Sequence, residues 1–327
     1  MISRRALLAG AAGLGVSLDA GFAPRADAQG YPDKPIKMIV PFPPGGPIDT
    51  MARLAGKFIT DSVGQQVVVE NRPGAGSTLG SKAVAASPPD GYTLMFGSSG
   101  SLAVAPTLYV NAGIDPLKMF APVASFALLP HVMVVAEQVP AKTVAEFVAY
   151  AKANAGKINY GAGLGTPPHL LSALFADKAG INATFIPYPG AAQSVIDLVA
   201  GRNHYTIDGT VILMPQIRAG KLRAIGMGRA ERWPELPDVP TLVEQGFPDF
   251  TIDAWTGVVA PHGTPAPIVT KINAAINAGL KTMEAKTALD RFSSIAKTST
   301  PQEFAAFIAD QEKRWGALVK LAGAKVE

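Results

Sequence analysis

The sequence predicts an α/β fold in which mostly parallel sheets are flanked by helices. Short apolar, strand-like runs alternate with segments of helical periodicity along most of the 327 residues, and turns rich in Gly and Pro join them. The composition agrees, because 48% of the residues are hydrophobic and 17% are charged. Such a chain is globular and has enough core for one or two domains.

The first predicted strand, within residues 36 to 49, runs through a turn with Pro44, Gly45 and Gly46 into a helix. Two glycines let the backbone approach a bound group closely, and the free N–H groups in the first turn of a helix favour an anion. The pattern is also an ordinary connection in α/β proteins. This segment alone therefore favours a structural role over ligand binding.

Strands at residues 67 to 69 and 92 to 96, with a helix at 76 to 86 between them, complete a βαβαβ unit. Asp49 is the expected N-cap of the first helix. Ligands of parallel sheets bind at the carboxyl ends of the strands, so we expect the Pro43 turn and the loop after residue 96 to meet at one site. This second loop contributes Ser98, Ser99 and Ser101.

The middle of the chain repeats this pattern. A strand at residues 158 to 161 leads through Gly163 to Thr166, the expected cap of a helix with proline at its first position. The glycine spacing differs from the dinucleotide fingerprint G-x-G-x-x-G, so no nicotinamide or flavin cofactor is expected. A strand at 205 to 208 ends in Asp208, whose carboxylate needs a donor from the protein or from a ligand.

The other predicted elements follow from the same local signals. They are helices at 143 to 153, 191 to 200, 214 to 218 and 268 to 280, strands at 184 to 188, 222 to 227 and 254 to 260, and a final helix that starts with a capping box at Thr300 and Glu303.

The first 28 residues predict a signal peptide. Arg4 and Arg5 precede an apolar run over residues 6 to 18, and Ala26 to Ala28 fit a small-residue cleavage site. The run is too short to span a bilayer. The paired arginines partly match a twin-arginine export signal, and the general secretory route is the alternative. Without Cys there is no disulfide and no lipid-anchoring cysteine, so we expect a freely soluble product after cleavage near Ala28.

The charge pattern argues against nucleic acid as a partner. The formal net charge of +4 becomes 26 minus 23, or +3, when residues 1 to 28 are removed. The Lys and Arg residues are scattered, and the densest set, at Arg218, Lys221 and Arg223, is better explained as a solvated face.

An ordered series of motifs resembles the substrate-binding proteins of tripartite tricarboxylate transporters, often called Bug proteins. The series covers nearly the whole chain after residue 28. It comprises residues 71 to 76 (NRPGAG), 89 to 94 (PDGYTL), 97 to 101 (GSSGS), 139 to 143 (VPAKT), 160 to 169, 187 to 188, 217 to 224 (IRAGKLRA), 236 to 241 (LPDVPT) and 260 to 267.

This resemblance implies a two-lobed periplasmic binding protein of the type II, flytrap fold. The first lobe would take residues 29 to 129 and 254 to 327, and the second lobe residues 130 to 253. The ligand would lie between the lobes, held chiefly by backbone N–H groups, hydroxyls and water. The implied binding residues are Phe42, Pro44, Gly45, Gly46, Asp49, Ser98, Ser99, Ser101, Gly163, Thr166, His169, Tyr188, Asp208 and Trp255.

Several of these residues have simpler explanations. His169, near a helix start, is as well explained by a structural role as by a ligand contact. Tyr188 and Trp255 are more often core residues than ligand platforms, although the prolines beside Tyr188 favour an exposed loop. Phe42, like them, could be either a core residue or a ligand platform. Asp49 is best explained as an N-cap and only secondarily as a pocket residue.

Catalysis has weaker support. The sequence Gly97 to Ser101 differs from the nucleophile elbow G-x-S-x-G in its last residue, and none of the four His residues stands at metal-ligand spacing from another. A triad of Ser99, His169 and Asp208 is the remaining catalytic alternative. We therefore expect neither an enzyme nor a bound metal or cofactor.

The sequence and the resemblance together predict a monomeric periplasmic protein. It would capture a small carboxylate, such as a di- or tricarboxylate, an aromatic acid or an acidic amino acid, and pass it to two integral membrane transporter subunits. One alternative is a sensor that presents its solute to a membrane receptor. The other is a serine-dependent periplasmic hydrolase.

Overall fold

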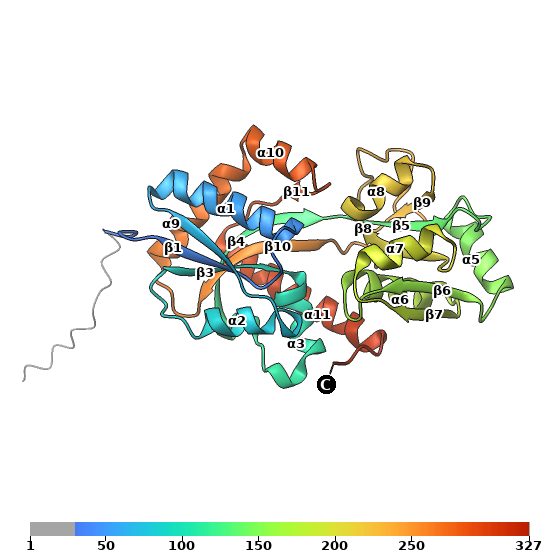
Figure 1. The fold of residues 1–327 in the computed structure, drawn as a ribbon, viewed down its shortest axis with the longest axis horizontal. Coiled ribbons are helices and arrows are strands. Elements are labelled where there is room, and N and C mark those ends of the chain that lie inside the picture. The colour runs from blue at the N-terminus through green and yellow to red at the C-terminus, as the bar shows by residue number, and fades with distance from the viewer. Residues whose placement is uncertain (1–29, 327) are drawn as a thin grey trace, which may run out of the picture.

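Residues 30–326 are described by a computed structural model, in which two sheets, each flanked by helices, form two lobes (Figure 1). The predicted signal peptide lies outside the described residues. Within residues 30–326, none of the helices has the length and apolar character needed to cross a bilayer.

The first sheet has the strand order β11-β4-β10-β3-β1-β2. Its strands are β1 (Ile36–Val40), β2 (Val67–Asn71), β3 (Thr93–Ser98), β4 (Phe120–Leu129), β10 (Ala254–Pro261) and β11 (Ile295–Ala296). The helices of this first lobe are α1 (Pro47–Val63), α2 (Thr78–Ala85), α3 (Ala105–Leu108), α4 (Pro116–Met119), α9 (Ala266–Leu280), α10 (Met283–Asp290) and α11 (Pro301–Leu321).

The second sheet has the strand order β7-β6-β8-β5-β9. Its strands are β5 (His131–Ala136), β6 (Ile158–Ala162), β7 (Ala183–Pro187), β8 (Tyr205–Gly209) and β9 (Leu222–Met227). The helices of this second lobe are α5 (Val144–Ala153), α6 (Pro167–Ala179), α7 (Ala191–Val199) and α8 (Thr210–Arg218).

The predicted two-lobed α/β fold is confirmed, but the sheets are mixed rather than mostly parallel. Parallel pairing joins β1 to β2 and β3, and β6 to β7 and β8. Antiparallel pairing occurs at the strands next to the lobe crossings: β10 is antiparallel to β3 and β4, and β5 is antiparallel to β8 and β9. In the first sheet, for example, the chain leaves along β4 for the second lobe and comes back along β10, so these two neighbouring strands run in opposite directions.

The chain passes between the lobes twice in the described residues. Pro130 separates β4 from β5, and residues 228 to 253 separate β9 from β10. The final helix α11 also packs against both lobes, touching β4 in one and α6 in the other. The sheets agree with this division of the chain, whereas the predicted bounds at residues 129 and 253 stay a prediction.

Local signals placed many elements well. The strand predicted at 222 to 227 is β9, and the predicted capping box is present at the start of α11. There the Thr300 hydroxyl accepts from the Glu303 N–H at 3.1 Å, and the Glu303 carboxylate accepts from the Thr300 N–H at 2.8 Å. Helix α1 ends at Val63 and is capped by Gly64, whose φ of 77° lies in the left-handed region that favours glycine.

Candidate functional site

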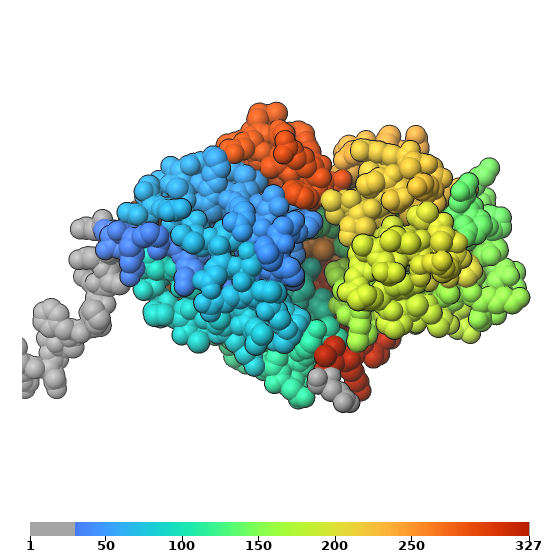
Figure 2. All heavy atoms as spheres, in the orientation of Figure 1, coloured from blue at the N-terminus to red at the C-terminus, as the bar shows by residue number. Residues whose placement is uncertain are grey.

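A cleft between the two lobes contains two adjoining cavities, which we call the first and the second cavity. Figure 2 shows the hollow between the blue-to-cyan part of the first lobe and the green-to-yellow second lobe. The first cavity measures about 440 Å³ and the second about 330 Å³. Ile48, Leu129, Thr166, Pro167 and Ala254 line both, so the two cavities form one continuous site built from both lobes.

The first cavity is largely apolar. Its lining includes Leu108, Tyr109 and Leu164 besides small hydroxyl residues, and no charged side chain is present among its described lining residues. Five of the residues implied by the resemblance lie here, namely Phe42, Ser98, Ser99, Thr166 and Trp255.

The second cavity lies at the beginnings of four helices. Residues at or next to the first turns of α1, α6, α7 and α8 line it. The α7 turn starts with three residues other than proline, whose N–H groups have no partner within the helix. Among the implied residues, Gly163, Thr166 and Asp208 line this cavity.

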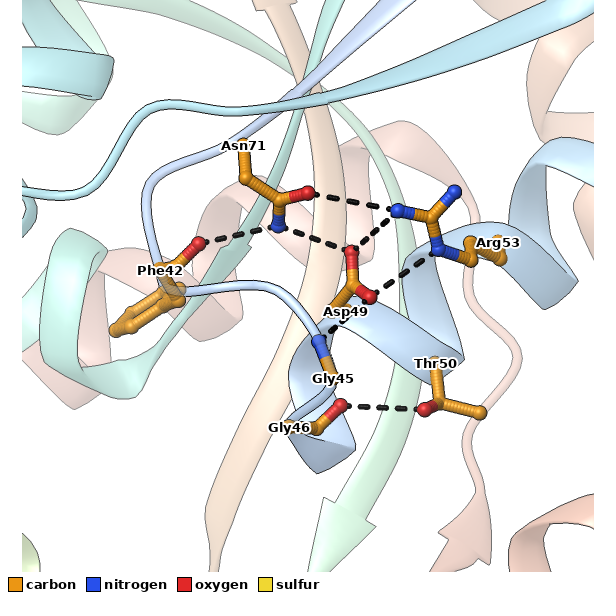
Figure 3. Close-up of polar contacts among 7 residues, drawn as sticks. All are labelled: Phe42, Gly45, Gly46, Asp49, Thr50, Arg53 and Asn71. Atoms are coloured by element: carbon orange, nitrogen blue, oxygen red, sulfur yellow. Dashed lines mark hydrogen bonds and ion pairs between the residues drawn. The ribbon is translucent and has the colours of Figure 1, made fainter.

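The turn before α1 is held by a buried acid rather than by a cap. Asp49 is 4% exposed, and its carboxylate accepts hydrogen bonds from the Gly45 N–H (3.0 Å), from Asn71 (2.9 Å) and from two nitrogens of Arg53 (both 3.1 Å), as Figure 3 shows. Asn71 also donates to the Phe42 carbonyl at 3.1 Å. This network fixes the turn that carries Phe42 into the cleft.

The prediction that Asp49 is the N-cap of α1 is wrong. The helix begins with proline at position 47, so Gly46 is the N-cap and Asp49 is the third helical residue. Burial acts to raise the pKa of Asp49, but the hydrogen bonds from Gly45, Arg53 and Asn71 outweigh it and lower the pKa below its usual value. Pro44, Gly45, Gly46 and Asp49 line neither cavity and instead shape the turn.

In the serine loop after β3, Ser101 holds the loop together and Ser99 lines the cleft. The Ser101 hydroxyl accepts from the Ser98 N–H at 2.9 Å and donates to the Ser98 carbonyl at 3.1 Å, so Ser101 closes the loop on itself. Ser101 is fully buried and lines neither cavity. Ser99 lines the first cavity, and its hydroxyl has no hydrogen-bond partner within the described residues.

His169 holds the turn before α6. Its Nδ1 accepts from the Gly165 N–H at 3.1 Å, and its ring stacks on Phe185 with centroids 3.8 Å apart. Burial lowers the pKa of His169 to about 4, so the ring is neutral at pH 7. The side chain is 1% exposed and lines neither cavity. These contacts favour the structural role, while the neighbouring Thr166 faces the cleft.

Tyr188 and Trp255 are mainly packing residues. The Tyr188 hydroxyl donates to Asp197 at 2.8 Å and accepts from Asn203 at 3.0 Å, and its ring lies so close to Gly161 that a Cβ there would be 2.5 Å away. Tyr188 lines neither cavity. Trp255 is 1% exposed, packs edge-on against Phe304 and lines the first cavity.

The structure does not assemble the alternative catalytic triad. Ser99 lines the first cavity, Asp208 lines the second, and His169 lies behind the α6 turn with its Nδ1 already engaged by Gly165. Within the part of the chain that is described, no group of three or more His, Cys, Asp or Glu could hold a metal ion.

Sequence reasoning missed several cleft residues. In the second cavity these include His131, Gly190, Ala191 and Thr210, and in the first cavity Tyr109. Gly190 is the N-cap of α7 shortly after β7, and Thr210 is the first residue of α8 directly after β8. This is the same arrangement that drew attention to the turn before α1. That signal was present but not applied to these two turns.

Comparison with known proteins identifies the family. Residues 51–324 match the model of the tripartite tricarboxylate transporter family receptor. The chain belongs to this family. BugT of Bordetella pertussis (strain Tohama I) is 37% identical over 313 residues, which are 94% of this chain and 95% of BugT. The predicted resemblance is thus confirmed. Binding proteins of this family are periplasmic receptors for substrates rather than enzymes.

Two solved structures of similar proteins contain carboxylates. MatC from Rhodopseudomonas palustris, with bound malate, is 34% identical with a TM-score of 0.74, and the match covers 88% of this chain and all of MatC (100%). Rpa4515 from R. palustris, with adipate, is 33% identical with a TM-score of 0.78, and the match covers 90% of this chain and 100% of Rpa4515.

Proposed function

We propose that this receptor captures a small carboxylate between its lobes and delivers it to a tripartite secondary transporter. The observation that carries the proposal is the second cavity, where four helices begin around one space. Helix N-termini carry a partial positive charge and N–H groups without a partner in the helix, which together favour an anion. The malate and adipate in the similar structures are consistent with this chemistry.

The four helix ends differ in what they offer. Proline at the first position of α1, and at the first two positions of α6, removes those N–H groups. The start of α7 at Ala191 and the start of α8 retain theirs, apart from the Thr210 N–H, which donates to the Pro130 carbonyl at 3.0 Å. We assign the main carboxylate contacts to α7 and α8.

Capture between the lobes supplies the signal for transport. A ligand that touches both lobes binds best when they are close, so it shifts the equilibrium towards the closed form. That form would dock on the two integral membrane subunits. We propose that the protein acts as a monomer in the periplasm, exported by the signal peptide over residues 1 to 28, and that it performs no catalysis.

Thermal unfolding tests this function. Residues 29–327 would be heated with malate, adipate, aromatic acids, acidic amino acids and the matching neutral amides. A bound acid at 100 times its Kd is expected to stabilise the protein by ~2.7 kcal/mol, while its amide does not. Stabilisation by neutral or cationic solutes but by no acid would contradict the carboxylate assignment.

A matched pair of proline variants tests the role of α7. Ala191→Pro removes one N–H at the first position of α7, where proline is tolerated because the preceding Gly190 is extended. The acid affinity is expected to fall roughly 5-fold, the value of one lost hydrogen bond of about 1 kcal/mol. Met283→Pro makes the same change at the exposed start of α10, which lines neither cavity, and should leave affinity unchanged.

A further inference from the structure

The second cavity contains an acid but no cation. Its lining has two titratable side chains, Asp208 and His131, and no Lys or Arg among its described residues. His131 is 3% exposed, and burial lowers its pKa to about 4, so it is neutral at pH 7. A carboxylate ligand in this cavity would therefore meet another carboxyl group without a side-chain cation to separate them.

Asp208 is free to contact a ligand. One of its oxygens, Oδ1, accepts from the Gly209 N–H at 2.6 Å, while Oδ2 has no hydrogen-bond partner within the described residues. The side chain is 4% exposed and lines the cavity. Burial raises the pKa of Asp208 to about 6, and the Gly209 N–H opposes that rise only in part.

Charged groups on the surrounding elements do not compensate Asp208. On β5 and α6 the histidines are neutral, and on β6 the titratable side chain is the buried Tyr160. Arg291 precedes the lining residue Phe292 but is exposed and does not line the cavity. Arg53 on α1 is paired with Asp49, Arg202 after α7 with Asp197, and Arg218 on α8 with Glu235. On β9 Arg223 donates to the Val139 and Ala141 carbonyls, and Arg229 after β9 acts on Asp253.

Two carboxylates held about 3 Å apart cannot both stay ionised. A ligand carboxylate arriving beside Asp208 raises the pKa of that side chain further, and the helix N-termini stabilise only the charge that remains. We propose that Asp208 binds its ligand as the protonated acid, so that capture of a carboxylate takes up one proton from solution. The Oδ2–H group then donates to a ligand oxygen.

This inference rests on the proposed function and adds a pH dependence to it. By linkage, a reaction that takes up one proton weakens up to tenfold for each unit of pH above the pKa of the free protein. Below that pKa Asp208 is already protonated, and the affinity levels off. The receptor would therefore load most tightly in a mildly acidic periplasm.

Titration calorimetry measures the proton directly. Malate, adipate and benzoate are the probes, each titrated at pH 7.5 in two buffers with different ionisation enthalpies, and again at pH 6.5 and 8.5. The wild-type protein is expected to take up about one proton per ligand at pH 7.5, and its affinity should fall about 10-fold between pH 7.5 and 8.5. This measurement needs no variant.

Two isosteric variants locate the proton. Asp208→Asn keeps a donor that cannot titrate, so the proton uptake should disappear and the affinity should become independent of pH. Asp253→Asn is the matched control, because burial also raises the pKa of Asp253 to about 6, against Arg229 and Lys297, yet Asp253 lines neither cavity. It should keep the wild-type proton uptake.

Acid binding without proton uptake by the wild-type protein would overturn the inference and leave the proposed function intact. The inference would also be overturned if Asp208→Asn still took up a proton on binding, since another group would then carry that proton. If none of the acids binds the folded wild-type protein, the proposed function fails, and this inference fails with it.

Discussion

The two lobes present the same turn to the cleft but support it with different chemistry. In each turn a glycine with positive φ, Gly45 at 82° and Gly165 at 71°, stands two residues before the first proline of a helix. The third residue of that helix then accepts the glycine N–H, Asp49 at 3.0 Å in α1 and His169 at 3.1 Å in α6. The backbone geometry is shared, whereas the acceptor is an anion in one lobe and a neutral ring in the other.

This difference teaches that the turn needs an acceptor of the right reach rather than a particular residue. Each acceptor brings its own support. Asp49 is tied into polar bonds with Arg53 and Asn71, while His169 is packed against the aromatic ring of Phe185. The two supports should therefore fail under different conditions, and three experiments separate them.

The largest effect is expected for Asp49→Ala. The change leaves the Gly45 N–H and the Asn71 amide without their acceptor in a buried turn, at a cost of about 3 to 4 kcal/mol in the free energy of unfolding. Arg53→Ala is the control and should cost less than about 1 kcal/mol, because the Arg53 side chain is 54% exposed. Urea unfolding measures both, and equal costs would show that the ion pair rather than the turn matters.

Acidification should weaken the second-lobe turn first. An unfolded His takes up a proton near its ordinary pKa of 6.5, but His169 does so only at about 4. Stability present at pH 7 is therefore lost as the pH falls from 6.5 towards 4, by at most about 3 kcal/mol. Asp49 also stabilises the folded protein because its pKa is lowered. That contribution is lost only at more acidic pH, as the pH falls below 3.8.

Unfolding free energies between pH 4 and 7 test this order. His169→Gln keeps an acceptor but does not titrate, so its stability should fall less than that of the wild-type protein over this range. His131 has a similar pKa of about 4, so it contributes the same loss of stability on acidification in the wild-type protein and in the variant. Identical pH curves for the two proteins would mean that His169 is not buried as a neutral ring.

The smallest effects on stability are expected for the two glycines. In Gly45→Ala the new Cβ would have no atom within 4 Å, so the free energy of unfolding falls only by the strain of positive φ, about 1 to 2 kcal/mol. Gly165→Ala adds a contact, because its Cβ would lie 2.2 Å from a methyl group of Leu108 in the other lobe. It should therefore also hinder closure and lower the affinity for an acid roughly 10-fold, the equivalent of about 1.4 kcal/mol.

Calorimetry with adipate compares the two glycine variants. Leu108→Ala combined with Gly165→Ala should restore part of the affinity, since it removes the methyl group that the new Cβ meets. A loss of affinity for Gly45→Ala as large as that for Gly165→Ala would contradict a clash between the lobes.

Prediction from sequence was most accurate where the signal is local. The capping box at Thr300 and the strand β9 were placed correctly, because cap bonds and turns involve residues a few positions apart. The N-cap of α1 was misplaced since a favourable Asp49 competed with an earlier proline start. The crossing strands β4 and β5 were not predicted, because the mostly apolar stretch from 120 to 136 continues through both lobes and its local pattern does not mark where one strand ends and the next begins.

The candidate site divides in the same way. Residues at the carboxyl ends of strands were found, and Thr166, Ser99 and Asp208 do line the cleft. His169 lies in the same turn as Thr166, and Tyr188 also follows a strand, β7, yet both side chains bond within the protein rather than line the cleft. Position along the chain does not specify which way a side chain points, because that depends on the packing around it.

By itself, the sequence determined where strands end and helices begin, and so which turns could form a binding site. Turn and cap chemistry acts between neighbours, and this is why it can be read from the order of residues. Only the tertiary structure decided that Leu108 meets Gly165 across the cleft and that Asp208 lies in a cavity without a cation. These features arise from contacts between distant parts of the chain, and such contacts set the desolvation that shifts the pKa of Asp208.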